Sequence, residues 1–485
     1  MDVDTVDENE TPAESQKAAG KKPLSLPVDD AHPLDLDAIT SSYTDRSIVE
    51  RLVHITAACP AVAVQALQLA LDQVFKMRDT NLYFSVRSAY EQCQGNSQGQ
   101  LPPITEIAPL DQKWIDETAA KNAAEKNKLE VELKTYSSNM IKESIRMAHR
   151  DLANYYRAVG DQASALKHYT KSREFCTTSH HVLDMCFSII ELLIEHRNYA
   201  HMSTYVFKAD AALDATASTA RPTGPTAPAN SSANRVLTER EKVQSKLDAG
   251  LGLSHFGQGQ YEKAANFFVK VGPIKSLGTW IGTVIAPGDI AVYGTLCALA
   301  TFPRPQISSQ ILNNDGFGAF IEQEPYVREL IEAYMSNRFK DVLGILEKYS
   351  TRHAVDPHLG AHIQILIKLI TNRALVLFFQ PFVSIRLERM STAFGWTVDE
   401  LEQHVVALIQ SGEIKARVDR QNKILKAKET DQRSVLYARV MKSGEHMASA
   451  NRKLLLRLRL QQADLIVKAP RSNQTISLND FDSYY

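Results

Sequence analysis

Three histidines, His353, His358 and His362, are the residues of this chain whose type and spacing most suggest a metal site. The last two are four positions apart, a spacing that places two imidazole rings on one face of a helix. A zinc site needs three or four ligands, but Gly360 lies between these two histidines and no cysteine or set of acidic ligands accompanies them. We therefore expect no metal ion.

Two glycine pairs, Gly250-Leu-Gly252 and Gly257-Gln-Gly259, raise the question of a nucleotide-binding loop. Such a loop follows a strand and opens a helix, whereas both pairs lie inside a helical pattern. The chain also lacks a nucleophile elbow, a phosphate loop, and the His-x-His followed by Ser and Asp that a zinc isopeptidase uses. We expect no catalytic residue, no cofactor and no enzymatic activity.

The remaining chemistry is the recognition of a charged partner by a cluster of six cations, Lys415, Arg417, Arg420, Lys423, Lys426 and Lys428. The segment 397–411 that precedes them carries three acids and no Lys or Arg. Phosphates bind through neutralisation by cations, so this acidic segment argues against a DNA reader. The cations form either a solvated face or a contact for an acidic partner, and nucleic acid is the less favoured ligand.

These charges belong to a predicted winged helix within residues 372–430. Residues 384–394 are predicted to form a helix that stops at Gly395, and Thr397 with Glu400 forms a capping box that opens a second helix. Two short alternating runs, residues 414–419 and 424–428, then predict a two-stranded wing.

A helical repeat precedes the winged helix, because one set of small and aromatic residues recurs 99 positions further on. Leu152, Ala153, Tyr156, Gly160, Ala165 and Tyr169 match Leu251, Gly252, His255, Gly259, Ala264 and Phe268. Residues 198–209 resemble a degenerate copy between them. This rhythm is typical of tetratricopeptide-like hairpins, and no strand is predicted before the wing.

A long amphipathic helix follows the winged helix. Its apolar stripe is made by Leu436, Val440, Met447, Leu454, Leu458 and Leu465. A lone helix with this stripe exposes much apolar surface, so we expect a helical bundle with other chains; packing against the chain's own solenoid is the alternative.

The predicted fold is mainly α: a tetratricopeptide-like solenoid, a winged-helix subdomain and a long C-terminal helix. The predicted segments are a disordered acidic N-terminus (1–33), a helical-repeat domain (34–315) with a disordered loop (214–235), a domain that ends in the winged helix (316–430), a bundle helix (431–468) and a flexible tail (469–485).

Composition gives a globular chain of 485 residues with 44% hydrophobic and 23% charged residues and a formal net charge of -1. Five scattered cysteines fit free thiols in a reducing compartment. The acidic N-terminus does not read as a signal peptide, and no run is long enough to span a membrane. We expect an intracellular protein.

Five long strings resemble the PCI family, whose members occur in the proteasome lid, the COP-nine signalosome and translation initiation factor three. The likeness is strongest to the family formed by the first subunit of the signalosome, and runs from about Leu34 to about Pro470. The strings are IKESIRMAHRDLANYY (141–156), GDIAVYGTLCALATF (288–302), NRALVLFFQPFVS (372–384), GEIKARVD (412–419) and DQRS (431–434).

The resemblance implies a noncatalytic scaffold of the complex that removes the ubiquitin-like Nedd modifier from cullins, with a zinc metalloprotease in another subunit. The implied partners are other PCI subunits, the metalloprotease subunits and, indirectly, cullin-RING ligases. In this family winged helices associate edge to edge and C-terminal helices form one bundle. The expected contact residues are Ile414, Ala416, Val418, Ile424, Leu425, Ala427, Val440, Met447, Leu454, Leu458 and Leu465. A scaffold of the proteasome lid or of an initiation factor, and a nucleic-acid adaptor, are the alternatives.

Overall fold

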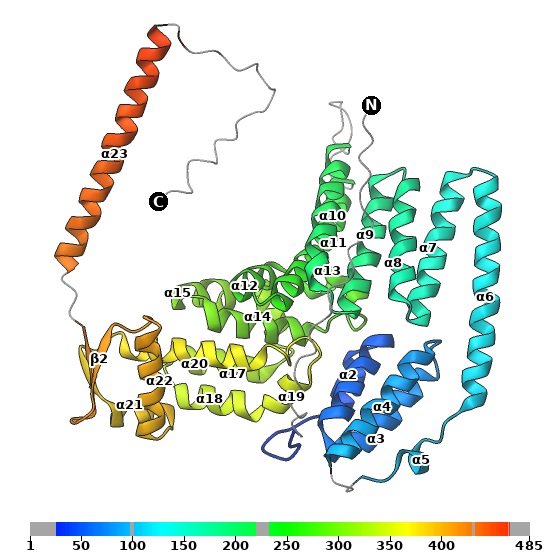
Figure 1. Ribbon diagram of the computed structural model, residues 1–485, viewed down its shortest axis with the longest axis horizontal. Coiled ribbons are helices and arrows are strands. Elements are labelled where there is room, and N and C mark those ends of the chain that lie inside the picture. The colour runs from blue at the N-terminus through cyan, green and yellow to red at the C-terminus, as the bar shows by residue number, and fades with distance from the viewer. Residues whose placement is uncertain (1–25, 98–100, 220–231, 429–431, 464, 466–485) are drawn as a thin grey trace, which may run out of the picture. The chain divides into compact units, whose positions relative to one another are not determined.

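The computed structural model describes residues 26–97, 101–219, 232–428, 432–463 and 465, without the side chains of 216–219, 232–238 and 432. Its contacts divide the chain into two units (Figure 1). The first contains Met1–Pro381 and Arg386–Glu413, and the second contains Phe382–Ile385 and Ile414–Tyr485. Helices make up nearly all of the first unit, as the sequence predicts.

The first unit begins with a group of helices around a shared apolar core. They are α1 (Leu36–Ser42), α2 (Asp45–Ala58), α3 (Ala63–Val74), α4 (Thr80–Asn96) and α5 (Ile104–Ile107), followed by the long α6 (Gln112–Ser138). Helix α2 buries Ile48, Leu52 and Ile55 on one face, at the spacing that aligns side chains along a helix. That face packs against α3 and α4.

Four helical hairpins share one turn geometry. They are α7 (Lys142–Val159) with α8 (Gln162–Ser172), α9 (Ser179–Glu195) with α10 (Tyr199–Thr219), α11 (Ser232–Gly257) with α12 (Tyr261–Lys270), and α17 (Pro325–Met335) with α18 (Phe339–Lys348). Each turn has one left-handed residue: Gly160, Arg197, Gly259 or Asn337. The next amide donates to a carbonyl five residues back, as Asp161 N does to Tyr156 O at 2.9 Å. This bond is the 6→1 bond of a Schellman turn.

The predicted repeat is therefore confirmed in three hairpins, and the fourth, α17–α18, was missed. Glycine is required at Gly252, because a Cβ atom there would lie 2.8 Å from the Phe268 ring of the facing helix. The fourth hairpin lacks that small-residue signature and has Asn337 in place of a turn glycine. Its sequence therefore does not match the spacing of the other copies.

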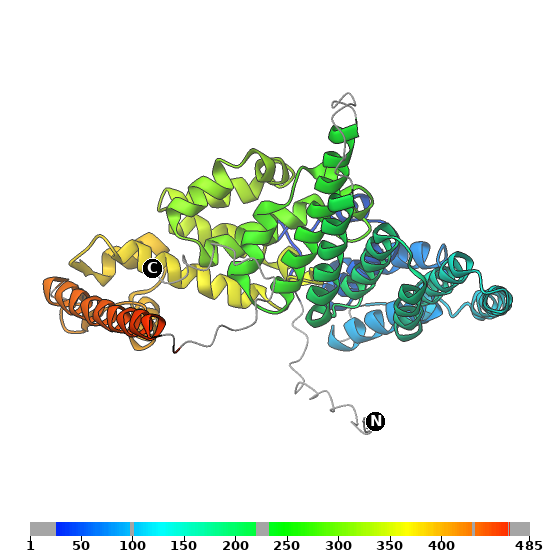
Figure 2. The ribbon, with the colours of Figure 1, turned by 90° about the horizontal axis from the view of Figure 1, so that it is seen from above.

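Helix α14 (Pro287–Thr301) lies at the centre of the first unit and is buried on all sides. It packs against α12, α16 (Asp315–Ile321), α17 and α20 (Ile363–Phe379). Figures 1 and 2 show the green and yellow helices of this part of the unit side by side. Helices on both sides of the predicted boundary between residues 315 and 316 thus share one core. The remaining short elements are α13 (Ile274–Leu277), α15 (Arg304–Ile307), α19 (Ser350–Val355), the 3₁₀ turns Pro60–Val62, Arg173–Phe175 and Gly278–Trp280, and the π turn Ser308–Leu312.

Parts of the predicted loop at residues 214–235 are helical. Helix α10 continues to Thr219 and α11 begins at Ser232, while residues 220–231 lie outside the described part of the chain. Alanines at 215 and 217 favour continuation of α10, because alanine has the highest helix propensity. The acidic N-terminus up to residue 25 and the tail from residue 466 also lie outside it.

Among the described residues, no single helix is both long and apolar enough to span a membrane. Only the bent pair Asp45–Ala58 and Pro60–Val74, with 119° between its helices, meets the length and composition test jointly.

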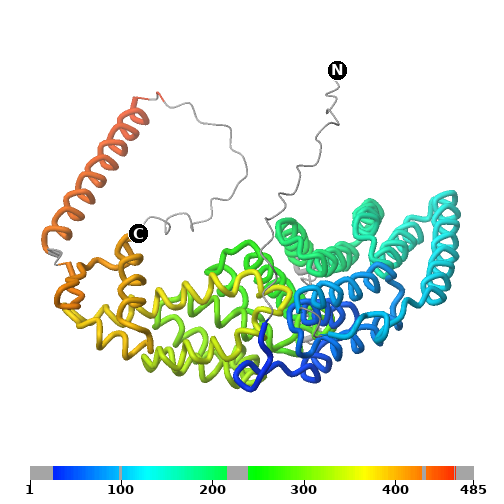
Figure 3. Tube along the Cα trace, turned by 60° about the horizontal axis from the view of Figure 1, so that its bottom comes forward, coloured from blue at the N-terminus to red at the C-terminus, as the bar shows by residue number. Residues whose placement is uncertain are grey.

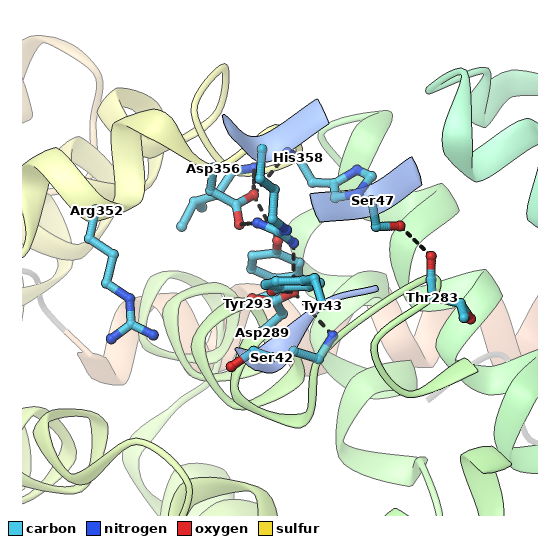
Figure 4. A network of polar contacts seen from close by, with 12 residues as sticks. Ser42, Tyr43, Ser47, Thr283, Asp289, Tyr293, Arg352, Asp356 and His358 are labelled. Atoms are coloured by element: carbon cyan, nitrogen blue, oxygen red, sulfur yellow. Dashed lines mark hydrogen bonds and ion pairs between the residues drawn. The ribbon is translucent and has the colours of Figure 1, made fainter. Parts of the chain in front are cut away.

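A buried arginine, Arg51, joins the first helices to the centre of the unit. Figure 4 labels four of the side chains that meet there, Tyr43, Asp289, Tyr293 and Asp356. Arg51 of α2 bonds to Asp289 of α14 at 2.7 Å and to Asp356, just after α19, at 2.5 Å. Its guanidinium carbon lies 3.9 Å from the centre of the Tyr43 ring, and the Tyr43 hydroxyl donates to Asp289. The Tyr293 hydroxyl donates to Asp356 at 2.7 Å. Three segments of the chain therefore meet at one cation.

The pKa values of the two carboxyl groups in this cluster are shifted in opposite directions. Burial raises the pKa of Asp356, but Arg51 and the hydrogen bonds that the carboxylate accepts outweigh burial and hold this pKa below its usual range. Burial raises the pKa of Asp289 above its usual value, against the attraction of Arg51. Asp356 is thus the firmly ionised partner of the arginine.

Backbone contacts strengthen the same junction. The Thr44 amide donates to the Gly282 carbonyl at 2.9 Å, and the Thr351 hydroxyl donates to the Pro27 carbonyl at 2.8 Å. The chain therefore leaves the centre of the unit through α3 to α6 and returns to it through the hairpins, as the tube in Figure 3 shows.

We predict that Arg51→Ala lowers the free energy of unfolding of the chain by about 3–5 kcal/mol, because it leaves two buried carboxylates without their cation. Urea unfolding followed by circular dichroism measures the loss. Arg328→Ala is the control, since Arg328 forms an exposed pair with Glu332 on α17 and its loss costs at most about 1 kcal/mol. Equal losses in the two variants would contradict a structural role for the Arg51 cluster.

A second prediction concerns pH. Burial lowers the pKa of His353 from 6.5 to about 4, and the ring lies 3.0 Å from the Tyr326 hydroxyl. Between these values the unfolded chain binds more protons than the folded one, so stability is complete above pH 6.5 and falls as the pH decreases. The free energy of unfolding therefore decreases between pH 7 and pH 5, and we expect this decrease to be about 1–2 kcal/mol smaller in the His353→Gln chain.

The control for this experiment is His180→Gln, which changes an exposed histidine on α9. Unfolding curves at pH 5, 6 and 7 compare the three chains. A His353→Gln chain with the pH dependence of its parent would show that this imidazole is not kept neutral by folding.

Candidate assembly interface

The predicted helix-turn-helix is present as α21 (Leu387–Phe394) and α22 (Val398–Gln410). Helix α21 ends at Gly395, as predicted, and this glycine has the left-handed conformation with φ 74°. Thr397 and Glu400 form the predicted capping box, with the Glu400 amide 3.4 Å from the Thr397 hydroxyl. Helix α22 buries one apolar face through Leu401, Val405 and Leu408.

The outer face of α22 is acidic. Asp399 and Glu400 are exposed in its first turn, where they complement the helix dipole, and the hydrogen bonds from Thr397 lower the pKa of Glu400. The exposed His404 stacks on Trp396 at a ring distance of 4.8 Å. Helix α22 contains no lysine or arginine. This face is therefore unsuited to phosphates.

The start of α21 corrects a prediction. Residues 384–386 form a strand, β1 (Ser384–Arg386), where the sequence predicts the first turn of a helix and no strand before the wing. The Val383 carbonyl accepts a hydrogen bond from the Ala427 amide at 2.7 Å, so pairing with a distant segment overrides the local helical pattern. This pairing cannot be read from neighbouring residues.

The wing therefore has three strands in the order β1-β3-β2. The predicted runs appear as β2 (Ala416–Asp419) and β3 (Ile424–Ala427), antiparallel, with Ala416 opposite Ala427 and Val418 opposite Leu425. Because β3 is central, its backbone has neighbours on both sides and cannot serve as the expected free edge. Strand β2 is an edge of this sheet, and edge strands are where another chain can pair.

The predicted contact residues of the wing differ in their exposure. The side chains of Ile414, Ala416 and Leu425 are buried. Ile414 and Ala416 can therefore meet a partner only through their backbone, whereas Leu425 lies in the central strand, whose backbone has neighbours on both sides. The side chains of Val418, Ile424 and Ala427 are partly exposed.

The exposed side chains of the wing place like charges opposite one another. Arg417 lies opposite Lys426 in the β2–β3 pair. The Lys428 amide donates to the Lys415 carbonyl at 2.9 Å, so these two lysines also lie opposite one another, just beyond the paired strands. All four side chains are exposed. Like charges directly opposite on a sheet are unfavourable, so this face favours an anionic partner.

The long C-terminal helix is α23 (Gln432–Gln462). The helix ends earlier than predicted, so that Leu465 lies beyond it. Every described side chain from 433 to 463 is exposed, including Leu454 at 57% and Leu458 at 52%. Leu436, Val440 and Met447 are exposed in the same stripe. The stripe is apolar and available to a partner.

The three histidines of the sequence do not converge. His353, His358 and His362 each face a different tyrosine hydroxyl, those of Tyr326, Tyr199 and Tyr261, at 3.0, 2.5 and 3.0 Å. Within the described ranges, no group of three or more His, Cys, Asp or Glu residues is placed to hold a metal ion. The five cysteines are free, and Cys176 is the least buried of them.

Sequence reasoning missed Arg51, Asp289 and Asp356, because their partners lie 238 and 305 residues away from Arg51. One signal was present: Arg51 interrupts the apolar face made by Ile48, Val49 and Leu52, and a charge in that position requires a buried partner.

Two protein families match parts of the chain. Residues 111–310 match the family described as 26S proteasome subunit RPN7, and residues 346–429 match the PCI domain. The second match covers α21, α22 and the wing, so the winged helix is the end of a PCI domain.

Individual relatives match nearly the whole chain. COP9 signalosome complex subunit 1 of Arabidopsis thaliana is 34% identical, over 92% of this chain and 94% of its own length. COP9 signalosome complex subunit 1b of Drosophila melanogaster is 31% identical, over 90% of this chain and 87% of its own. The 26S proteasome non-ATPase regulatory subunit 6 homolog of Arabidopsis thaliana is 19% identical over 72% of this chain.

We predict that Lys426→Glu stabilises the wing, because it replaces the repulsion from Arg417 by attraction across the strands. Amide hydrogen exchange in β2 and β3 should slow by about twofold to fivefold. Lys423→Glu is the control, since Lys423 lies in the turn outside the paired register. Equal slowing in both variants would show that net charge, and not the opposed pair, controls the wing.

Proposed function

This chain belongs to the COP9 signalosome complex subunit 1 family, and from this premise we propose that it is a noncatalytic scaffold subunit of a complex that removes the Nedd modifier from cullins. The chemistry of that removal is assigned to a zinc metalloprotease in another subunit. The proposed contacts are with other PCI subunits and the metalloprotease subunits, and with cullin-RING ligases indirectly, in the nucleus and cytoplasm.

The observation that carries this proposal is the exposed stripe of α23. Leu436, Val440, Met447, Leu454 and Leu458 follow one another at four and seven residues and therefore lie on one helix face. A helix with such a face gains stability by burying it, and in this proposal the matching faces belong to helices of other subunits. The proposed bundle is thus made between chains.

The proposed second contact is the edge of the wing. Strand β2 has β3 on one side, and its other side is the edge at which a neighbouring PCI subunit would add a strand. Arg417 and the opposed Lys426 would then select a neighbour with an acidic surface.

Two alternatives lead to different partners. A scaffold of the proteasome lid is supported by the match of residues 111–310, although the identity to the relative named for the proteasome is lower, at 19%. A nucleic-acid adaptor is supported by the cationic wing and opposed by the acidic face of α22.

The test is affinity purification of the tagged chain from eukaryotic cells, followed by mass spectrometry. We expect the other signalosome subunits and cullins, and we expect Leu454→Asp with Leu458→Asp to lose most of them while keeping the helicity of the chain. The stripe packs against other chains in this proposal, so its loss breaks the complex without unfolding the subunit.

The matched control is Ala438→Asp with Ser449→Asp, which places two aspartates on the opposite face of the same helix. This variant should retain the complex. If the parent chain recovers proteasome subunits, the chain is a scaffold of the proteasome lid and not of the signalosome. If the Leu454→Asp, Leu458→Asp chain unfolds, the stripe packs within the chain.

A further inference from the structure

The first unit contains a groove among its N-terminal helices. It has a volume of about 450 Å³ and lies between α3, α4 and the segment that joins α5 to α6. These helices adjoin one another at the N-terminal end of the unit, the blue part of Figure 1. Apart from Asp111, the lining residues precede both matched family segments.

One wall of the groove is aromatic. Phe75 and Tyr83 line it, with ring centres 6.0 Å apart, and Trp114 lies against both, at 5.4 Å from Phe75 and 5.5 Å from Tyr83. Leu71, which also lines the groove, is buried. Packed rings of this kind form a preformed apolar surface, and a cavity of this volume is within the range that ligand sites occupy.

Apolar side chains continue from the groove onto the surface. Phe75 is 41% exposed, Leu110 is 50% exposed, and Phe84, which packs on Tyr83, is 47% exposed. Large exposed apolar side chains are unremarkable when scattered, but three beside one cavity form a patch. A patch of this kind usually contacts another molecule.

The charges that line the groove are all negative. Asp72 and Asp111 are exposed at its rim, and the residues that line it include no lysine or arginine. The nearby Arg87 donates to the Ala108 carbonyl, and its guanidinium carbon lies 5.9 Å from the centre of the Tyr83 ring. This bond to a neutral oxygen leaves the positive charge in place, and the two carboxylates at the rim outnumber it. An anionic rim beside an aromatic wall favours a ligand that combines a cation with an apolar group and repels phosphate.

We propose that this groove binds a short segment of a partner protein in which a bulky apolar side chain is followed within a few residues by arginine or lysine. The apolar side chain fills the space against Phe75 and Tyr83. The cation lies at the carboxylates of Asp72 and Asp111. The amide of Gln68, at the same groove, is available to the backbone of the bound segment.

Charge complementarity selects this occupant over two others. The acidic N-terminus of this chain, with eight acids and three lysines in residues 1–30, has the same sign as the rim. A nucleic acid also carries the wrong sign. The basic apolar run of α23, residues 451–460, has suitable chemistry and must be tested as a competing occupant that would come from a second copy of this chain.

The probe is an array of ten-residue peptides, each with one fixed Leu and one fixed Arg that are separated by one to four residues. Each peptide has a control, its Glu twin, in which Glu replaces the Arg. Fluorescence polarisation with the full-length chain measures affinity in solution. We expect at least one peptide to bind about fivefold or more tightly than its twin, with an affinity that falls as salt rises.

Two variants locate the binding. Asp72→Arg and Leu110→Asp should each weaken the bound peptide by about fivefold or more, while the control Glu91→Lys, an exposed charge change on α4 outside the groove, should not. Unchanged thermal unfolding of each variant shows that the fold is kept.

Three results would overturn the proposal. They are equal affinity for the peptides and their Glu twins, binding that survives Asp72→Arg, and preferential binding of the peptide that spans residues 451–460, which would make the occupant a second copy. None of these results depends on membership of the complex, so the groove and the proposed scaffold function can fail separately.

Discussion

The cation of Arg51 is the constraint on which the first unit depends. A buried guanidinium is costly unless carboxylates meet it, and here Asp289 and Asp356 come from two other segments of the chain. The helices from α1 to α6 therefore cannot separate from α14 and α19 without leaving an unpaired charge in an apolar interior. The Tyr43 and Tyr293 hydroxyls satisfy the same carboxylates and fix their orientation.

A unit closed in this way is suited to a scaffold. Its core is complete, with α14 buried on all sides, and its surfaces are available for contact without a change of fold. The second unit is different, because few of its side chains are buried and α23 exposes an apolar stripe along its length. Burial of that stripe requires another helix, and this requirement is the physical basis of the proposed assembly.

The three exposed surfaces differ in the sign of their charge and therefore favour different partners. The face of α22 is acidic, the exposed face of the wing is cationic, and the rim of the groove near α3 and α4 is acidic. Fields of opposite sign on separate surfaces guide different partners to different places, and each disfavours the wrong one. The chain as a whole is nearly neutral, with a formal net charge of -1, so this division is invisible in the composition.

The sequence by itself determined the features whose causes lie within one or two helical turns. Gly160 and Gly259 end helices in the left-handed conformation, Thr397 and Glu400 cap α22, and the stripe of α23 follows from spacing alone. Only the tertiary structure decided the partners of Arg51, the pairing of Val383 with Ala427 that turns a predicted helix into β1, and the groove beside Phe75. These features join segments far apart in the chain, so local propensity and periodicity do not identify the segments that meet.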